Sequence, residues 1–132
     1  MTFIEAMRAW VTGTLRFGGR SPRAEVAWVL LVHVIVMGLG TGFAGVLGVD
    51  LGFGLWIAWP VLTATPTLAL VWRRLHDMDS SGWWAVAFLP FLLLAWTLPF
   101  ALVALAVIPG TPARNRFGPR PGARENVADV FR

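Results

Sequence analysis

The sequence turns polar at Trp72-Arg73-Arg74-Leu75-His76-Asp77 and stays so through Asp79-Ser80-Ser81-Gly82-Trp83-Trp84. Long apolar runs flank this stretch: Asp50 is the only charged residue between Val26 and Trp72, and residues 83–113 contain none. A water-soluble fold needs polar surface in such runs, whereas a lipid bilayer does not. The pattern therefore predicts an all-α integral membrane protein whose spans meet around this polar stretch.

The composition supports the same class. Apolar residues make up 57% of the 132 residues and charged residues 14%, against roughly a quarter charged in soluble domains. The net charge is +4 and every basic residue is Arg. These arginines sit near the ends of the apolar runs, as the positive-inside rule places them. We therefore expect the bilayer as partner, and no nucleic acid.

The residues that bind metals and cofactors are scarce. The chain has no cysteine, which excludes disulfides and thiolate metal sites, and it has only two histidines. A pairing such as His76-Asp77 needs further His and Asp ligands to hold a metal. We expect no metal, no cofactor and no catalytic set.

Residues 2–13 have the pattern of an amphipathic helix, with Phe3, Ile4, Met7, Trp10 and Val11 on one face. Either this helix lies in the headgroup layer with Trp10 as its anchor, or it packs on its own protein. A basic loop follows, containing Arg16, Arg20 and Arg23. We expect these arginines in the headgroup zone, either as a general membrane anchor or as a specific site for anionic head groups.

Two spans are predicted at about residues 24–44 and 51–72, since 21 helical residues cover about 30 Å, the thickness of the hydrocarbon layer. Gly38 and Gly42 form one small-xxx-small pair in the first span, and Gly40 and Ala44 form another. Such faces let helices approach closely. They predict packing against the second span or, through the Gly38/Gly42 face, against a second copy in a homo-oligomer.

One ionisable side chain, His33, falls near the middle of the first span. A polar group at that depth is either functional or a neutral imidazole bonded to a neighbouring helix. Thr63 and Thr67, one turn apart in the second span, are the candidate partners.

Residues 83–108 are uncharged and would be about 39 Å long as one helix. Pro90 and Pro99 divide them, so the alternative is a re-entrant hairpin turning near residues 95–99. Length favours a third span, whereas charge favours the hairpin, which would leave all eleven arginines on one side. We predict three spans in a single membrane domain, residues 1–121. An irregular Arg/Pro/Gly-rich tail covers residues 109–132.

Helix-end rules account for much of the central polar stretch. Arg73 and Arg74 lie at a helix C-terminus, and either can pair with Asp77 at helical spacing. Ser81 is a capping candidate and Trp83 an interfacial anchor. These rules do not require His76, so the stretch is also a candidate functional motif.

Three blocks of the sequence resemble the family called domain of unknown function 805, the YhaH-like bacterial inner-membrane proteins. The blocks are Phe17-x-Gly19-Arg20-x-x-Arg23-x-Glu25, Arg73-Arg74-Leu75-His76-Asp77-x-x-x-Ser81-Gly82-Trp83-Trp84 and Gly110-Thr111-Pro112-x-x-Asn115-Arg116-Phe117-Gly118-Pro119. The resemblance covers about residues 10–121. It implies a multi-pass protein of the bacterial inner membrane, here with a cytoplasmic N-terminus, and it implies no activity. It adds Asn115 and Arg116 to the candidate motif.

Three functions fit these features. The first is a membrane-embedded interaction or scaffold protein that uses the cytoplasmic Arg/His/Asp motif. The second is an oligomeric small transporter or channel subunit, with His33 and the glycine face lining a path. The third is a membrane enzyme that handles lipid phosphates, with Arg73, Arg74 and Arg116 as phosphate ligands. We expect the first, and a protein that is not an enzyme.

Overall fold

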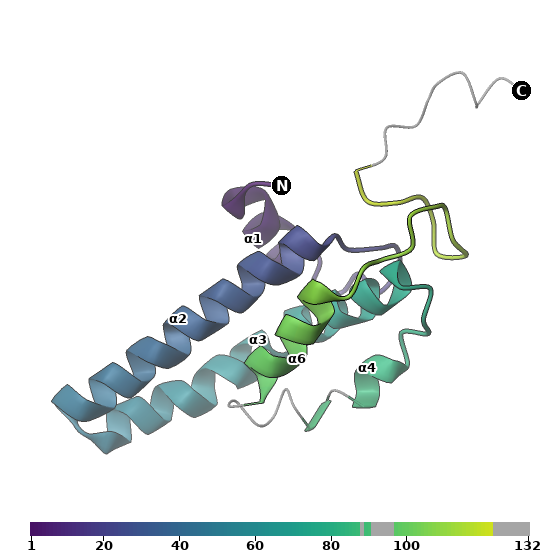
Figure 1. The fold of residues 1–132 in the computed structure, drawn as a ribbon. Helices are drawn as coiled ribbons and strands as arrows, with labels where there is room; N and C mark the ends of the chain where they lie inside the picture. The colour runs from purple at the N-terminus through teal and green to yellow at the C-terminus, as the bar shows by residue number, and fades with distance from the viewer. Residues whose placement is uncertain (88, 91–96, 123–132) are drawn as a thin grey trace, which may run out of the picture.

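The computed structural model describes residues 1–87, 89–90 and 97–122, without the side chains of residues 47, 50, 51 and 55. The described part of the chain is helical and contains no β-strand beyond one isolated bridge between Asn115 and Gly118. Its helices are α1 (Phe3–Thr12), α2 (Arg23–Leu47), α3 (Val49–Asp77), α4 (Trp84–Ala87) and α6 (Leu98–Val107). Figure 1 shows α2 and α3 as two long antiparallel rods, with α1 and α6 beside the end where α2 begins and α3 ends.

The two long helices contain the stretches that can cross a membrane. Arg23–Val46 and Gly52–Asp77, with 24 and 26 residues, are long and apolar enough by length and composition. Large apolar side chains such as Leu39, Val61 and Leu62 point outward and are more than half exposed. The all-helical class and two candidate spans agree with the sequence analysis, although both helices run longer than predicted.

α2 starts at Arg23 with Pro22 as its N-cap residue, and no side chain caps it. Ser21 lies one residue outside the helix, and its backbone N–H donates to the Arg73 carbonyl (3.2 Å). α3 continues past the predicted end at residue 72 to Asp77, because Arg73 and Arg74 find buried partners there.

The two long helices approach each other closely near their shared turn. A Cβ atom on Gly52 would overlap Ala44 and would lie 2.8 Å from the Gly40 carbonyl oxygen. The Gly40/Ala44 face therefore packs against α3, as one of the predicted alternatives had it. By contrast, a Cβ atom on Gly38 or Gly42 would meet no atom within 4 Å. Pairing of that face with a second copy stays a prediction.

α1 packs on its own protein through one face. A capping box joins Thr2 and Glu5 at its start. Trp10, only 6% exposed, lies against Trp59 of α3 with ring centroids 6.5 Å apart. Ile4 and Val11, which we predicted on the same face as Trp10, instead lie on the outer face and are exposed. The packed alternative is what the structure shows, and a position in the headgroup layer stays a prediction for the outer face.

Residues 83–108 do not form the single helix predicted from their length. α6 has ten residues, or about 15 Å, half of the hydrocarbon thickness. The Trp83 ring lies 5.4 Å from that of Trp72, and the Ile108 carbonyl accepts from Arg74 (2.5 Å). Both ends of the segment therefore lie at the same end of α3, which matches the hairpin alternative. Residues 95–96 of its predicted turn are outside the described residues.

The hydrophobic core lies where α2 begins and α3 ends, and α1, α2, α3 and α6 contribute to it. Its buried members include Trp10 of α1, Val26 and Val29 of α2, Leu70 and Leu75 of α3, and Leu98, Leu102 and Leu105 of α6. Residues 109–122 follow α6 and return as a loop over the end of α3 (Figure 1). The polar stretch is therefore enclosed between this apolar core and the loop.

Candidate functional site

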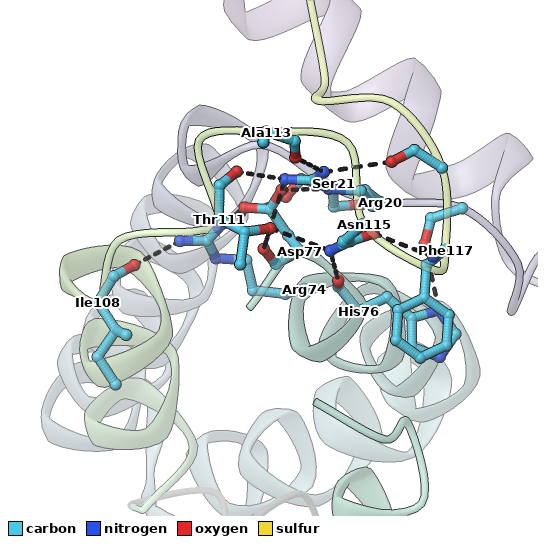
Figure 2. Close-up of polar contacts among 12 residues, drawn as sticks. Arg20, Ser21, Arg74, His76, Asp77, Ile108, Thr111, Ala113, Asn115 and Phe117 are labelled. Carbon is cyan, nitrogen blue, oxygen red and sulfur yellow. Dashed lines mark hydrogen bonds and ion pairs between the residues drawn. The ribbon is translucent and has the colours of Figure 1, made fainter. Parts of the chain in front are cut away.

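One carboxylate, that of Asp77, lies at the centre of the polar contacts (Figure 2). Arg20 donates through Nε to its Oδ1 atom (2.8 Å), and Arg74 donates through Nη1 to its Oδ2 atom. The side chains of Arg20, Arg74 and Asp77 are 1%, 0% and 7% exposed. Asp77 thus holds two buried cations that are 54 positions apart in the sequence numbering, residue 20 and residue 74.

Arg20 joins the loop before α2 to the loop after α6. Its Nη1 atom donates to the Ala113 carbonyl (2.8 Å), and its Nη2 atom donates to the Thr111 carbonyl (2.7 Å). With the bond to Asp77, all three guanidinium nitrogens have acceptors. The sequence placed Arg20 in the headgroup zone, but the structure uses it as an internal tie.

Arg74 holds the C-terminal end of α6. Its Nε atom donates to the Leu105 carbonyl (2.9 Å), its Nη2 atom to the Ile108 carbonyl (2.5 Å) and its Nη1 atom to the Ser21 carbonyl (3.4 Å). Carbonyls in the last turn of a helix lack intrahelical donors and attract positive charge. The guanidinium of Arg74 therefore caps α6 from the neighbouring helix.

The neighbouring arginine has a different partner. Arg73 donates to the Glu25 carboxylate of α2 (3.0 Å), and both side chains are buried. Adjacent helical residues point about 100° apart, so only one of the pair can face Asp77. The structure selects Arg74, the i, i+3 alternative. Arg73 with Glu25 instead cross-links the two long helices.

The loop after α6 caps the end of α3 in turn. Thr111 donates to the Asp77 carbonyl through its backbone N–H (2.8 Å) and its hydroxyl (3.1 Å). Asn115 donates through Nδ2 to the His76 carbonyl (2.8 Å) and to the Thr111 hydroxyl (3.0 Å). We call Arg20, Arg74, Asp77, Thr111 and Asn115 the clasp, because together they fasten three distant segments.

His76 lies at the edge of the clasp and is 7% exposed. Its ring stacks on Phe117 with centroids 3.7 Å apart and 5° between planes. Its Nδ1 atom lies 3.2 Å from the Gly19 carbonyl oxygen. Because a carbonyl only accepts, Nδ1 carries the proton in this bond. His76 therefore connects Gly19, in the first sequence block, to Phe117, in the third, and holds both loops against the end of α3.

The other candidate residues lie outside the clasp. Arg116 makes an exposed ion pair with Asp79 (3.3 Å), and Ser81 Oγ accepts from the Trp83 backbone N–H (3.4 Å). Trp83 is 73% exposed. Arg16 and Arg23 are also exposed, and within the described part of the chain neither side chain makes a hydrogen bond or ion pair.

The polar group in the middle of α2 forms a separate cluster. The Nδ1 atom of His33 lies 2.8 Å from the Val29 carbonyl oxygen, and its Nε2 atom lies 3.4 Å from the Thr63 hydroxyl. Trp10 and Trp59 enclose the ring edge-on at centroid distances of 5.7 and 5.6 Å. Thr67, the other candidate partner, is fully buried, and its hydroxyl has no partner among the described residues.

Sequence reasoning missed three participants: Glu25, Thr111 and Phe117. A signal existed for Glu25, because an acid in the first turn of a membrane span needs a cation nearby. Thr111 and Phe117 stand within the third sequence block, but nothing in their residue types indicated contact with α3. Among the residues the structure covers, no three His, Asp or Glu side chains are grouped as metal ligands.

Comparison with known proteins gives a consistent result. The family model for "Protein of unknown function (DUF805)" matches residues 14–119. Inner membrane protein YhaH of Escherichia coli K12 is 38% identical over 114 residues, covering 80% of this chain and 86% of the relative. Inner membrane protein YhaI of the same strain is 36% identical over 106 residues, covering 80% and 85%. No solved structure matches the chain.

Proposed function

The chain belongs to the DUF805 family and is a small bacterial inner-membrane protein, and from that premise we propose that it is a membrane-embedded interaction protein. The observation that carries the proposal is how the buried arginines are used. Every guanidinium nitrogen of Arg20 and Arg74 donates to an acceptor within the protein. Such a site holds segments together, and it leaves the exposed arginines of the loops to meet a partner.

A topology accompanies this proposal. α2 and α3 cross the membrane, and residues 83–108 enter and leave on one side. The nine arginines within the described residues all precede α2, begin it, end α3 or follow α6. The positive-inside rule then places the clasp and the N-terminus in the cytoplasm. Under this topology the N-terminus, residues 78–83 and residues 109–122 form one cytoplasmic surface.

The partner surface consists of cations that the fold leaves accessible. Arg16, Arg114 and Arg116 are exposed on loops that the clasp fixes in place. Arginine forks bind carboxylates in defined geometry, so we expect an acidic protein segment as the contact. By contrast, the lipid-phosphate enzyme needs Arg73 and Arg74 for substrate, and both are occupied by Glu25 and Asp77.

The test is site-specific photo-crosslinking in living cells, with the reactive residue at position 114. We expect a discrete protein adduct that His76→Ala removes, because this substitution releases Phe117 without touching the Arg20 and Arg74 ion pairs. Arg8→Gln serves as the matched control, since it removes an exposed arginine on α1. If the adduct is absent, or if it is equally strong in the His76→Ala protein, the interaction proposal fails.

One observation favours a second candidate, an oligomeric transporter or channel subunit. The face with Gly38 and Gly42 is open, since an added Cβ would meet nothing within 4 Å. A second copy can approach such a face closely. This candidate requires a stable oligomer in lipid. A monomeric mass for the protein in nanodiscs, and in mild detergent, rules it out.

A further inference from the structure

A cavity of about 540 Å³ lies beside the clasp, between the start of α2 and the loop after α6. Its lining includes Pro22, Arg23, Asp77, Gly110, Thr111 and Arg120. Of its two arginines, Arg23 comes from the first turn of α2 and Arg120 from the loop after α6. Neither guanidinium has a hydrogen-bond or ion-pair partner among the described residues. The cavity thus holds two cations that the fold leaves unpaired.

The charge around this cavity is unbalanced. Arg20 and Arg74 are buried and share Asp77 as their only carboxylate within the described ranges. One buried positive charge therefore has no carboxylate. The exposed Arg23 and Arg120 add two further unpaired cations at the cavity. The other nearby acids are taken, since Glu25 pairs with Arg73 and Asp79 with Arg116.

An excess of buried positive charge is costly unless an anion compensates for it. Arg23, Arg120 and Asp77 line the cavity, whereas Arg20 and Arg74 lie behind Asp77 and do not. An anion between Arg23 and Arg120 would therefore contact these two arginines and compensate for the buried charge from a distance, against the repulsion of the Asp77 carboxylate. The missing counter-charge is the observation that points to a ligand.

The N-terminus of α2 also favours an anion in this cavity. Its N-cap residue is Pro22, and no side chain caps its first N–H groups. The N-terminus of a 25-residue helix carries a partial positive charge and free donors, and both favour an anion. Guanidinium forks match phosphate oxygens better than they match a spherical halide.

We propose that the cavity between Arg23 and Arg120 binds a phosphate group, which supplies the negative charge that Arg20 and Arg74 lack. The phosphate belongs either to an anionic lipid head group or to a soluble phosphate compound. This site is distinct from the partner surface, because Arg23 and Arg120 are not among Arg16, Arg114 and Arg116. Of the basic-loop arginines that we expected to bind anionic head groups, this site uses only Arg23. Its second arginine, Arg120, lies 97 positions later in the sequence.

The first experiment uses the purified full-length protein in a neutral detergent. Thermal unfolding is followed against inorganic phosphate, with sodium chloride at matched ionic strength. We expect phosphate to raise Tm in a saturable way that chloride does not reproduce. Loss of one charged contact costs about tenfold in affinity or more, so Arg23→Gln and Arg120→Gln should each weaken binding by about that factor.

Arg8→Gln is the control here also, since it removes the same charge from α1 outside the cavity. Wild-type affinity is expected for that variant. The proposal is overturned if phosphate acts no better than chloride, or if Arg8→Gln weakens binding as much as Arg23→Gln does. The Tm shift and the affinities of the variants are measured on the purified protein. They therefore test the phosphate site whether or not the crosslinking experiment finds a partner.

The second experiment separates the two sources of phosphate by native mass spectrometry. The protein is released from nanodiscs of phosphatidylglycerol or of phosphatidylcholine. Retention of phosphatidylglycerol by the wild type, and its loss in Arg120→Gln, assigns the cavity to a lipid head group. A saturable response to inorganic phosphate with no retained lipid in either case assigns it to a soluble phosphate compound. Lipid retained equally by both proteins and no response to phosphate overturns the site.

Discussion

Gly110 lies against the carboxylate of Asp77, so close that a Cβ atom at position 110 would overlap the Asp77 Oδ2 atom. This is the oxygen that Arg74 binds. Only glycine lets the loop after α6 come near enough for the Thr111 backbone N–H to reach the Asp77 carbonyl (2.8 Å). A glycine in the third sequence block is therefore required by an ion pair in the second.

Gly110→Ala should push Asp77 out of the clasp. We expect a loss of about 1–3 kcal/mol in the free energy of unfolding, typical of an overfilled site or of a disturbed buried ion pair. Gly18→Ala is the control, since an added Cβ there meets nothing within 4 Å. Reversible denaturation in mixed micelles measures both. Equal stability of the two variants would show that the loop can move away at no cost.

Arg74→Lys should destabilise the protein although it keeps the charge. A lysine ammonium is a point donor and cannot reach Asp77, Leu105 and Ile108 in the directions that the guanidinium does. We expect a loss of about 2 kcal/mol or more, because buried acceptors lose their donors. Arg16→Lys, on the exposed loop, should change little. The same denaturation assay applies, and a stable Arg74→Lys protein would contradict the role of the guanidinium in capping α6.

The proposed topology can be measured in intact cells. Because the chain has no cysteine, single cysteines at positions 49, 80 and 114 can be labelled with an impermeant thiol reagent. We expect position 49, the first residue of α3 after the turn at Gly48, to label from outside, and positions 80 and 114 to be protected together. Labelling of position 114 along with position 49 would mean that residues 83–108 cross the membrane.

Gly52→Ala should loosen the packing of α2 on α3, because the new methyl group would overlap Ala44. Gly54→Ala is a close control, since position 54 on the same helix has open space around it. We expect a loss of about 1–3 kcal/mol for the first substitution, as for other overpacked sites, and none for the second. Gly42→Ala tests the open face, and should alter only an oligomer, if one forms.

Trp10→Ala should detach α1 from the two long helices. The Trp10 ring is buried against His33 and Trp59, and truncating a buried aromatic costs about 3–5 kcal/mol. Faster proteolysis within residues 1–13 and a lower Tm are the expected results. Val11→Ala on the exposed side should leave both unchanged. If the two variants behave alike, α1 is held by the bilayer and not by the protein.

Much of this arrangement followed from the sequence because it depends on local periodicity. Uncharged runs predicted α2 and α3, and helical spacing predicted that Asp77 pairs with Arg73 or Arg74. The choice between these two arginines was beyond local rules. It depends on which way α2 and α6 face α3, and Glu25 and the Leu105 carbonyl decide it.

The path of residues 83–108 could not be predicted from local sequence patterns. Length favoured a crossing helix and the distribution of arginines favoured a hairpin, so local rules gave opposite answers. What decides between them is contact over long sequence distance, such as that between Arg74 and the Ile108 carbonyl. Similarly, the family motif indicated that Arg20 and Asn115 matter, but their shared role appears only when the three segments are seen together (Figure 2).

The order in which the ribosome delivers these segments gives the clasp a further meaning. Arg74 leaves the ribosome 31 and 34 residues before the carbonyls of Leu105 and Ile108 that will receive it, and Arg20 leaves 91 and 93 residues before Thr111 and Ala113. Until then Asp77 is their shared carboxylate, but the carbonyl acceptors of α6 and of the loop after it are missing. The loop after α6 is therefore the last of the three segments to supply acceptors to these buried arginines.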